Sequence, residues 1–355
     1  MSISISQSLS DKISSFSLLC AAMVVGIHVA EVYEHGTVMW WWSRIGHYGV
    51  FLIAVPFFFA VSGFFLAGHF KENGWWRREC LKRVRSLLMP YVIWSSVAVI
   101  MTLGMVLGAN ILHGRGLSAN IPILWRWWAL AFGFNPFIYP GVVPLWYIRT
   151  LMIFVLISPL LYQTVKLFGT KTLIVIYVVC GMVIVFASGR FQLFMRYTFS
   201  LNGLFFFVLG MIIRLGEYKL ESKNKLIHWS ALVLGAVVLG FSICFCEIET
   251  RAFSFVRMIY VPLFLYAAWN LLPMVKLPGW LSSSAFPIFL LHVLVWRLLG
   301  TIEMATHQHY FAFLRPESFH GWGVKWIIGF GGSLMLALSL RRAFPRFANI
   351  AFGGR

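Results

Sequence analysis

The stretch ISSFSLLCAAMVVGIHVAEV, residues 13–32, decides the fold class. It is apolar over about 20 residues, the length that an α-helix needs to cross about 30 Å of hydrocarbon. Comparable runs recur along the chain and predict further spans near residues 47–68, 87–109, 142–162, 172–188, 199–214, 227–245, 254–272, 284–303 and 323–341. We therefore expect an all-α, polytopic integral membrane helical bundle with about ten transmembrane helices.

The composition of the chain agrees with the bilayer as its solvent. Hydrophobic residues make up 60% of the sequence and charged residues 11%, whereas soluble domains average roughly 45–50% and about 25%. So few charges cannot cover a surface that faces water. Because neither an appended soluble domain nor an internal repeat is visible, we expect a single transmembrane domain over residues 1–355.

The basic residues follow the pattern of a membrane protein. A net charge of +18 would suggest a nucleic-acid partner for a soluble protein. Here the 29 basic residues lie mainly between the apolar runs, which indicates contacts with anionic lipids and no nucleic acid. The larger share falls on the side of the two chain ends, which predicts that both termini are cytoplasmic.

The five cysteines have neither the spacing of zinc ligands nor that of a disulfide framework. We therefore expect no metal site. The sequence does not indicate an oligomeric state.

Polar residues inside apolar runs are costly and mark candidate sites. His28 lies toward the outer end of the first run, and Glu31 falls on the same helical face. A carboxylate there can orient the imidazole, which is suited to take a proton from a hydroxyl near neutral pH. The alternative is a structural histidine that is hydrogen-bonded across helices.

Two further polar side chains lie in later runs. Arg149 is about one turn into the run that starts near residue 142, where it serves either an anionic ligand or a structural ion pair. His292 is flanked by apolar residues on both sides, and a packed, hydrogen-bonded helix contact is the favoured interpretation.

The loop HFKENGWWRRECLKRVRSLLMPY, residues 69–91, carries six basic residues. An acyl-coenzyme A donor would arrive on this cytoplasmic side with several phosphate charges, which arginine can grip with two hydrogen bonds. A topology determinant that also anchors lipid explains the same charge without a ligand.

Several segments together resemble the acyltransferase family 3 membrane proteins. The first is VVGIH, which ends at His28, and the second is PFFFAVSGFFLAG at residues 56–68. The basic loop follows and leads into Pro90. Then come PLWYIRTLMIFVLISPLL at residues 144–161 and FPIFLLHVLV at residues 286–295. The resemblance covers most of the chain and implies acyl transfer to carbohydrates of the bacterial surface.

The resemblance also implies roles for single residues. His28 would be the essential intramembrane histidine, acting as general base on the acceptor hydroxyl or as a relay for the acyl group. Arg83 and Arg85 would hold coenzyme A, and Arg149 would serve the donor or acceptor pocket. The remaining pocket residues would be Ser62 and Gly63, which let helices pack closely, together with Trp146 and His292.

The chain departs from the family pattern at one position of the donor site. The family has a basic residue eleven positions before the histidine, and Ser17 stands there in this sequence. Lys12 is a candidate substitute. After the LW motif, Leu151 and Met152 replace the acidic pair of another branch, which indicates the branch without a fused extracytoplasmic domain.

The resemblance thus implies an O-acyltransferase of the bacterial cytoplasmic (inner) membrane. The donor would be acyl-coenzyme A, with acetyl-coenzyme A as the first candidate, and no cofactor would be bound. The acceptor would be a hydroxyl of a cell-envelope or exported polysaccharide, or of its lipid-linked precursor. The alternatives are a transporter or flippase of a lipid-linked saccharide, and a catalytically degraded family member, as Ser17 suggests.

Overall fold

The computed structural model describes residues 6–29, 33–112, 132, 142–216, 223–247, 250–306 and 318–354. Within these ranges the chain forms helices joined by turns and short loops, and no β-strand. The helices in chain order are α1 (Gln7–Val29), α2 (Val38–Trp42), α3 (Ala54–Ala67), α4 (Trp75–Arg83), α5 (Met89–Leu112), α7 (Leu145–Leu156), α8 (Ser158–Phe168), α9 (Lys171–Phe186), α10 (Gly189–Tyr197), α11 (Leu201–Leu215), α12 (Lys225–Phe245), α13 (Arg251–Leu271), α14 (Gly279–Ser282), α15 (Ala285–Thr306), α16 (Phe319–Ala343) and α17 (Pro345–Ala351), with short π- or 3₁₀-helical turns at Ser43–His47, Val50–Ile53 and Val84–Leu88.

Six of the described helical segments are long and apolar enough to cross a membrane. They are Gln7–Val29, Val38–Ala67, Trp75–Met105, Lys225–Phe245, Arg251–Leu271 and Phe319–Ala343. Three shorter apolar helices accompany them, at Lys171–Phe186, Leu201–Leu215 and Ala285–Leu299. The prediction of an all-α, multi-pass membrane protein is thus confirmed. The count of about ten spans and the cytoplasmic termini stay predictions.

The predicted span at 142–162 is not straight. Its two halves, α7 and α8, meet at Ile157 with a bend of 64°. Pro159 causes the break, because proline lacks an N–H and its ring clashes with the carbonyl four residues earlier. That carbonyl belongs to Val155, and the Ser158 hydroxyl donates to it at 2.6 Å. The bend therefore leaves no unsatisfied acceptor at Val155.

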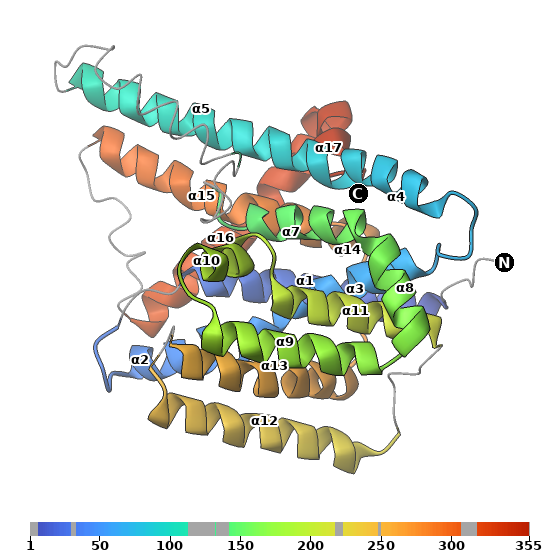
Figure 1. Ribbon diagram of the computed structural model, residues 1–355. Helices are drawn as coiled ribbons and strands as arrows, with labels where there is room; N and C mark the ends of the chain where they lie inside the picture. The colour runs from blue at the N-terminus through green and yellow to red at the C-terminus, as the bar shows by residue number, and fades with distance from the viewer. Residues whose placement is uncertain are drawn as a thin grey trace.

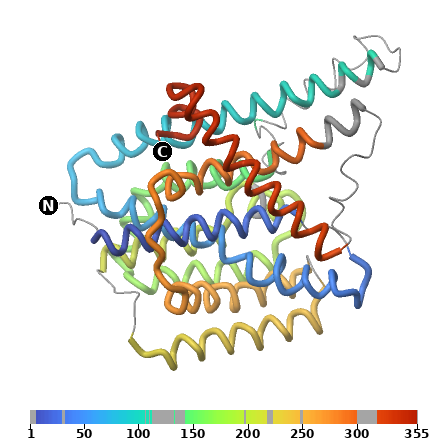
Figure 2. The backbone as a smooth tube through the Cα atoms, turned by 180° about the vertical axis from the view of Figure 1, so that it is seen from behind, coloured from blue at the N-terminus to red at the C-terminus, as the bar shows by residue number. Residues whose placement is uncertain are grey.

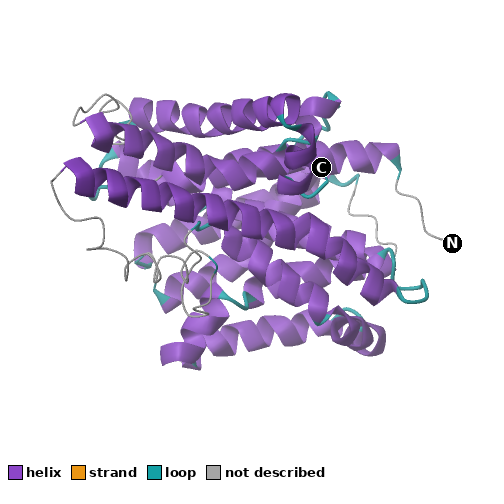
Figure 3. Ribbon diagram, turned by 90° about the horizontal axis from the view of Figure 1, so that it is seen from above, coloured by secondary structure: helices purple, strands orange, loops and turns teal. Residues whose placement is uncertain are grey.

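The long helices lie side by side, roughly along one direction (Figures 1 and 3). The N-terminus and the turn between α3 and α4 lie at one end of the bundle, which we call the amino end; α2 and α10 lie at the other, the far end (Figures 1 and 2). Helix α1 contacts α3, α15 and α16. These contacts bring the first run of the sequence beside one of the last.

Close backbone contact holds α3 against α11. A Cβ atom on Gly63 would collide with the carbonyl oxygen of Phe207, and one on Gly210 would collide with that of Ala60. In lipid, helices associate through such close packing rather than through a hydrophobic driving force. The contact with α11 therefore holds α3 rigidly in place. It also fixes the orientation of the face of α3 that points away from α11.

Candidate functional site

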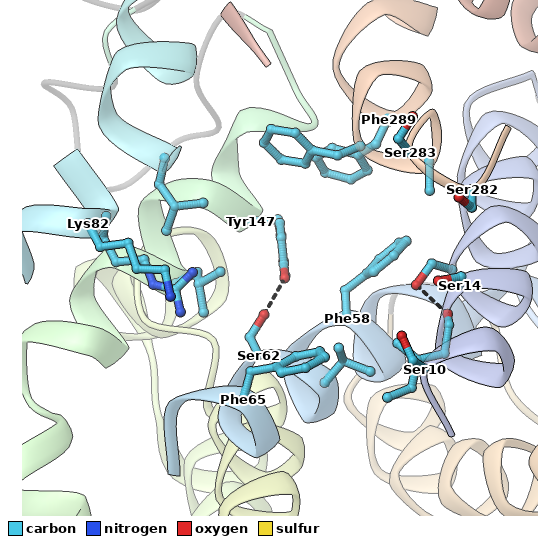
Figure 4. Close-up of a pocket in the computed structure, with 18 of the residues that line it drawn as sticks. Ser10, Ser14, Phe58, Ser62, Phe65, Lys82, Tyr147, Ser282, Ser283 and Phe289 are labelled. Atoms are coloured by element: carbon cyan, nitrogen blue, oxygen red, sulfur yellow. Dashed lines mark hydrogen bonds between the residues drawn. The ribbon is translucent and has the colours of Figure 1, made fainter. Parts of the chain in front are cut away.

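A cavity of about 460 Å³ opens between α1, α3, α4, α7 and the α14–α15 segment (Figure 4). Helix α1 contributes Ser10, Ser14 and Ser17 from one face, as their helical spacing requires. Ser62 of α3 faces the cavity, whereas its neighbour Gly63 packs on α11. One residue of the predicted pair thus lines the site, and the other fixes the helix that carries it.

The amino end of the cavity is basic. Lys82 and Arg83 of α4 line it together with His69. All three surround the buried Glu79, whose carboxylate oxygens lie 3.4 Å from Lys82 Nζ, 3.2 Å from Arg83 Nη2 and 3.7 Å from His69 Nε2. One carboxylate thus orders two permanent positive charges and leaves an excess of positive charge at the cavity.

His69 is also tied to the turn between α3 and α4. Its Nδ1 lies 3.1 Å from Oε1 of Glu72, and this hydrogen bond lowers the pKa of the Glu72 carboxyl, with the charges of His69 and Arg78 adding to the effect. Because this pKa is depressed, ionised Glu72 stabilises the folded chain at pH values above its unfolded-state pKa. This stabilisation is lost as the pH falls through the folded-state pKa. Near neutral pH the turn therefore keeps the ion pair between Glu72 and Arg78.

Three aromatic rings form the inner wall of the cavity. Ring centroids are 6.1 Å apart for Phe58 and Phe289, 5.5 Å for Tyr147 and Phe289, and 6.2 Å for Phe58 and Tyr147. We call these residues the aromatic triad (Figure 4). The Tyr147 hydroxyl lies 3.2 Å from Oγ of Ser62, so the triad is apolar with one polar atom in the wall.

A pair of histidines lies behind the aromatic triad. The rings of His28, near the end of α1, and His292, in α15, have centroids 5.1 Å apart. The His292 ring is also 6.4 Å from that of Phe289, which lines the cavity. The structure thus brings together two intramembrane histidines separated by most of the chain, and Phe289 joins them to the cavity wall.

A third histidine, His47, belongs to the same cluster and is absent from the sequence prediction. It ends the π-helical turn Ser43–His47, lies against the backbone of Gly26 and Ile27 and interacts electrostatically with His28. The signal was available, because His47 is a polar residue at the start of an apolar run. The sequence alone could not show that its segment folds back on the end of α1.

The other predicted site residues lie away from the cavity or outside the described residues. Glu31 lies outside the residues that the structure describes. Arg85 is exposed on the turn Val84–Leu88 and does not line the cavity, unlike Arg83. On α7, Tyr147 and Leu151 line the cavity, so Arg149 lies on another helical face.

Arg149 and its neighbour Trp146 have partners of their own. Arg149 interacts electrostatically with Tyr91, whose hydroxyl donates to the carbonyl oxygen of Phe132 at 3.0 Å. The Trp146 ring packs on Phe59 with centroids 6.2 Å apart. Neither residue lines the cavity, and their proposed roles in the donor or acceptor pocket stay predictions.

The resemblance implies a basic residue on α1 at the position where Ser17 stands. Ser17 lines the cavity and donates its hydroxyl to the Ile13 carbonyl of its own helix at 2.7 Å. Lys12 does not line the cavity, and its ammonium group lies 4.7 Å from the centroid of the Trp269 ring. Positive charge reaches this cavity from α4 instead.

The described residues contain no group of three or more histidine, cysteine, aspartate or glutamate side chains that could hold a metal ion. The polar groups that line the cavity are imidazole, hydroxyl and cationic groups. These groups suit proton transfer, hydrogen bonding and the binding of anions.

Comparison with known proteins agrees with this assembly of residues. A family model described as an acyltransferase domain matches residues 18–342, nearly the whole chain. Comparisons with curated proteins and with solved structures give no match. The matched region includes the histidine pair, the aromatic triad and the basic helix α4. The resemblance read from the sequence is thus confirmed: the chain is a multi-pass membrane protein that belongs to acyltransferase family 3.

Proposed function

We propose that the protein is a membrane-bound O-acyltransferase that uses acyl-coenzyme A, with acetyl-coenzyme A as the first candidate. The acceptor is a hydroxyl of a cell-envelope or exported polysaccharide, or of its lipid-linked precursor. The protein would act in the bacterial cytoplasmic membrane with both termini in the cytoplasm, so that the amino end faces the donor.

One observation carries this proposal: a single cavity has a basic wall at the amino end and an aromatic wall that touches the histidine pair. Its volume of about 460 Å³ falls in the range of small-molecule pockets. A donor with an anionic head and a narrow, hydrogen-bonding arm matches this polarity. Lys82 and Arg83 would hold the phosphates, and the serine hydroxyls of α1 would bond the arm.

The basic pair on α4 also accounts for the departure at Ser17. Phosphate binding requires cationic donors within reach of the ligand. Any helix that lines the cavity can provide them. Arg83 is the better placed of the two predicted arginines, because it lines the cavity while Arg85 is exposed beside it. We therefore assign the donor contact to Lys82 and Arg83.

His28 would act as the general base. The acceptor hydroxyl approaches from the far end of the bundle, and His28 takes its proton as the oxygen attacks the thioester carbonyl carbon. The thioester reaches His28 only if the donor's acyl end passes the rings of Phe58 and Phe289. Those rings therefore separate the bound donor from the acceptor side.

The proposal is tested with membranes that contain the wild type, His28→Ala or the control His228→Ala. His228 is also a buried histidine, but it lies on α12, away from the cavity. The membranes receive radiolabelled acetyl-coenzyme A, and label is followed into polysaccharide and glycolipid fractions. We expect transfer with the wild type and His228→Ala, and none with folded His28→Ala.

Two results would count against this proposal. Transfer that persists in His28→Ala would remove His28 from the chemistry. No transfer by the wild type from acetyl-coenzyme A or from a series of longer acyl-coenzyme A donors would contradict the enzymatic function. Uptake or flipping of a lipid-linked saccharide under the same conditions would then favour the transporter.

A further inference from the structure

His292 is held in one tautomer by its own helix. Its side chain is fully buried, and Nδ1 lies 3.1 Å from the carbonyl oxygen of Ile288, one turn earlier in α15. A carbonyl oxygen only accepts hydrogen bonds, so the proton of this contact belongs to Nδ1. In the neutral ring, Nε2 is therefore the nitrogen that carries the free electron pair.

Nε2 of His292 is buried and has no hydrogen-bond partner among the residues that the structure describes. Buried polar atoms are rarely left unpaired, so such an atom in a candidate site calls for an explanation. The rings around it are His28, with a centroid distance of 5.1 Å, and Trp296, at 5.4 Å in an edge-to-face arrangement. A nitrogen with a free electron pair and no protein partner among the described residues thus lies beside the proposed general base.

The position of His292 along α15 shows on which side of His28 it lies. Phe289, one turn closer to the amino end, lines the cavity, and its ring is 6.4 Å from that of His292. His47 approaches His28 from the turn that follows α2, at the far end of the bundle. Of the two histidines next to His28, His292 is therefore the one on the side where the donor's sulfur would lie.

We propose that His292 is a proton relay between His28 and the leaving thiolate of coenzyme A; this inference rests on the acyl-transfer function proposed above. The acceptor oxygen bonds to the carbonyl carbon, and His28 takes the hydroxyl proton. The carbon–sulfur bond breaks, and its electron pair stays on sulfur. The proton passes from His28 to Nε2 of His292 and then to the sulfur, so coenzyme A leaves as a free thiol and both rings return to neutral.

The Ile288 contact is what suits His292 to this task. Because Nδ1 keeps its proton in the bond to the Ile288 carbonyl, Nε2 is the one atom of the ring that can gain and lose a proton. Because the same atom serves both transfers, the Nε2–H bond has to swing from His28 toward the sulfur between them. His228 also has a buried, unpartnered Nε2, so what distinguishes His292 is its position between His28 and Phe289, with ring centroids 5.1 Å and 6.4 Å away.

The relay is tested with two variants that remove Nε2 in different ways. His292→Asn retains an amide donor at the depth of Nδ1, and His292→Phe retains a packed ring without nitrogen. The matched control is His228→Asn, because His228 is likewise buried with an unpartnered Nε2 but lies on α12. Each variant is assayed in membranes with radiolabelled acetyl-coenzyme A and the endogenous acceptors, after its folded fraction has been measured.

A relay predicts that kcat falls by about a hundredfold or more in both His292 variants, the scale of lost acid–base catalysis. The KM for acetyl-coenzyme A stays near the wild-type value, and His228→Asn matches the wild type. A folded His292→Asn with wild-type kcat overturns the inference, and so does a rise in KM without a fall in kcat. If His292→Phe does not fold, His292→Asn alone decides. Absence of transfer by the wild type would instead refute the proposed function, on which the relay depends.

Discussion

The hydroxyl oxygens of Ser62 and Tyr147 lie 3.2 Å apart in the wall of the cavity, where they join α3 to α7. Each residue also lines the cavity, so their hydroxyls are available to a ligand as well as to each other. A neutral hydrogen bond of this kind contributes only about 0.5–1.5 kcal/mol to stability. Its position suggests a larger role in binding than in folding.

Tyr147→Phe should separate these two roles. The variant keeps the ring in the aromatic triad but removes the phenol oxygen, so we expect the free energy of unfolding to fall by no more than about 1.5 kcal/mol. We expect the KM for acetyl-coenzyme A to rise several-fold, because the donor's arm loses a partner. The KM is measured from initial rates of acetyl transfer at several concentrations of acetyl-coenzyme A. Unchanged KM values in both Tyr147→Phe and Ser62→Ala would show that neither hydroxyl touches the donor.

Gly63 makes a prediction about folding. A methyl group at this position would collide with the Phe207 carbonyl oxygen, and backbone cannot move aside cheaply. Overpacking of this kind costs about 1–3 kcal/mol, so Gly63→Ala should lower the melting temperature in detergent. Gly104→Ala is the control, because a Cβ on Gly104 of α5 would meet nothing within 4 Å. Equal melting temperatures for the two variants would argue against the α3–α11 contact.

The sequence is a better guide to which segments contribute to the candidate site than to which residue of a helix faces the cavity. Apolar run length is sufficient to predict membrane helices, and an intramembrane histidine stands out against it. Which of two adjacent residues faces a cavity depends on helix rotation, and this is set by packing with distant segments. Ser62 and Gly63 therefore divide between the cavity and α11, and Tyr147 rather than Arg149 lines the site.

Two further features required three-dimensional contacts. His292 resembles a packed core histidine when its own helix is considered alone, and its significance comes from α1, far away in the sequence. The bend at Ile157 follows from Pro159, but a proline in the sequence does not by itself fix the angle of 64°. The periodicity of a single segment contains no information about either relationship.

Arg83 and Arg85 give a direct comparison on one helical segment. Arg83 lines the cavity and bonds Glu79 at 3.2 Å, whereas Arg85 is exposed and does not line it. A hydrogen bond to a charged group contributes about 1.5–3 kcal/mol, so Arg83→Gln should raise the KM for acetyl-coenzyme A by roughly 10- to 100-fold. Arg85→Gln should leave it within about threefold of the wild type.

The same pair can be tested for its charge. Added salt weakens exposed ionic contacts, so the KM of the wild type should rise with ionic strength, and that of Arg83→Gln should rise less steeply. Initial rates of label transfer at several salt concentrations provide the comparison. If Arg85→Gln loses the salt dependence and Arg83→Gln keeps it, the phosphates bind on the exposed face of the turn after α4 instead.

The aromatic triad makes the last prediction, which concerns the length of the acyl group. The ring centroids of Phe58 and Phe289 are 6.1 Å apart, and the two rings lie between the cavity and His292. A short acyl group therefore passes them more easily than a long one. Phe58→Leu removes part of this wall and keeps an apolar side chain. We expect kcat/KM for butyryl- or hexanoyl-coenzyme A, relative to acetyl-coenzyme A, to rise about tenfold, the scale of a methylene-sized change in a pocket. Phe65→Leu is the control, because Phe65 lines the same cavity but lies two helical turns along α3 from Phe58, toward the amino end. Equal ratios for the wild type and Phe58→Leu would mean that the acyl group does not pass between these rings, and the donor would then have to reach His28 by another route.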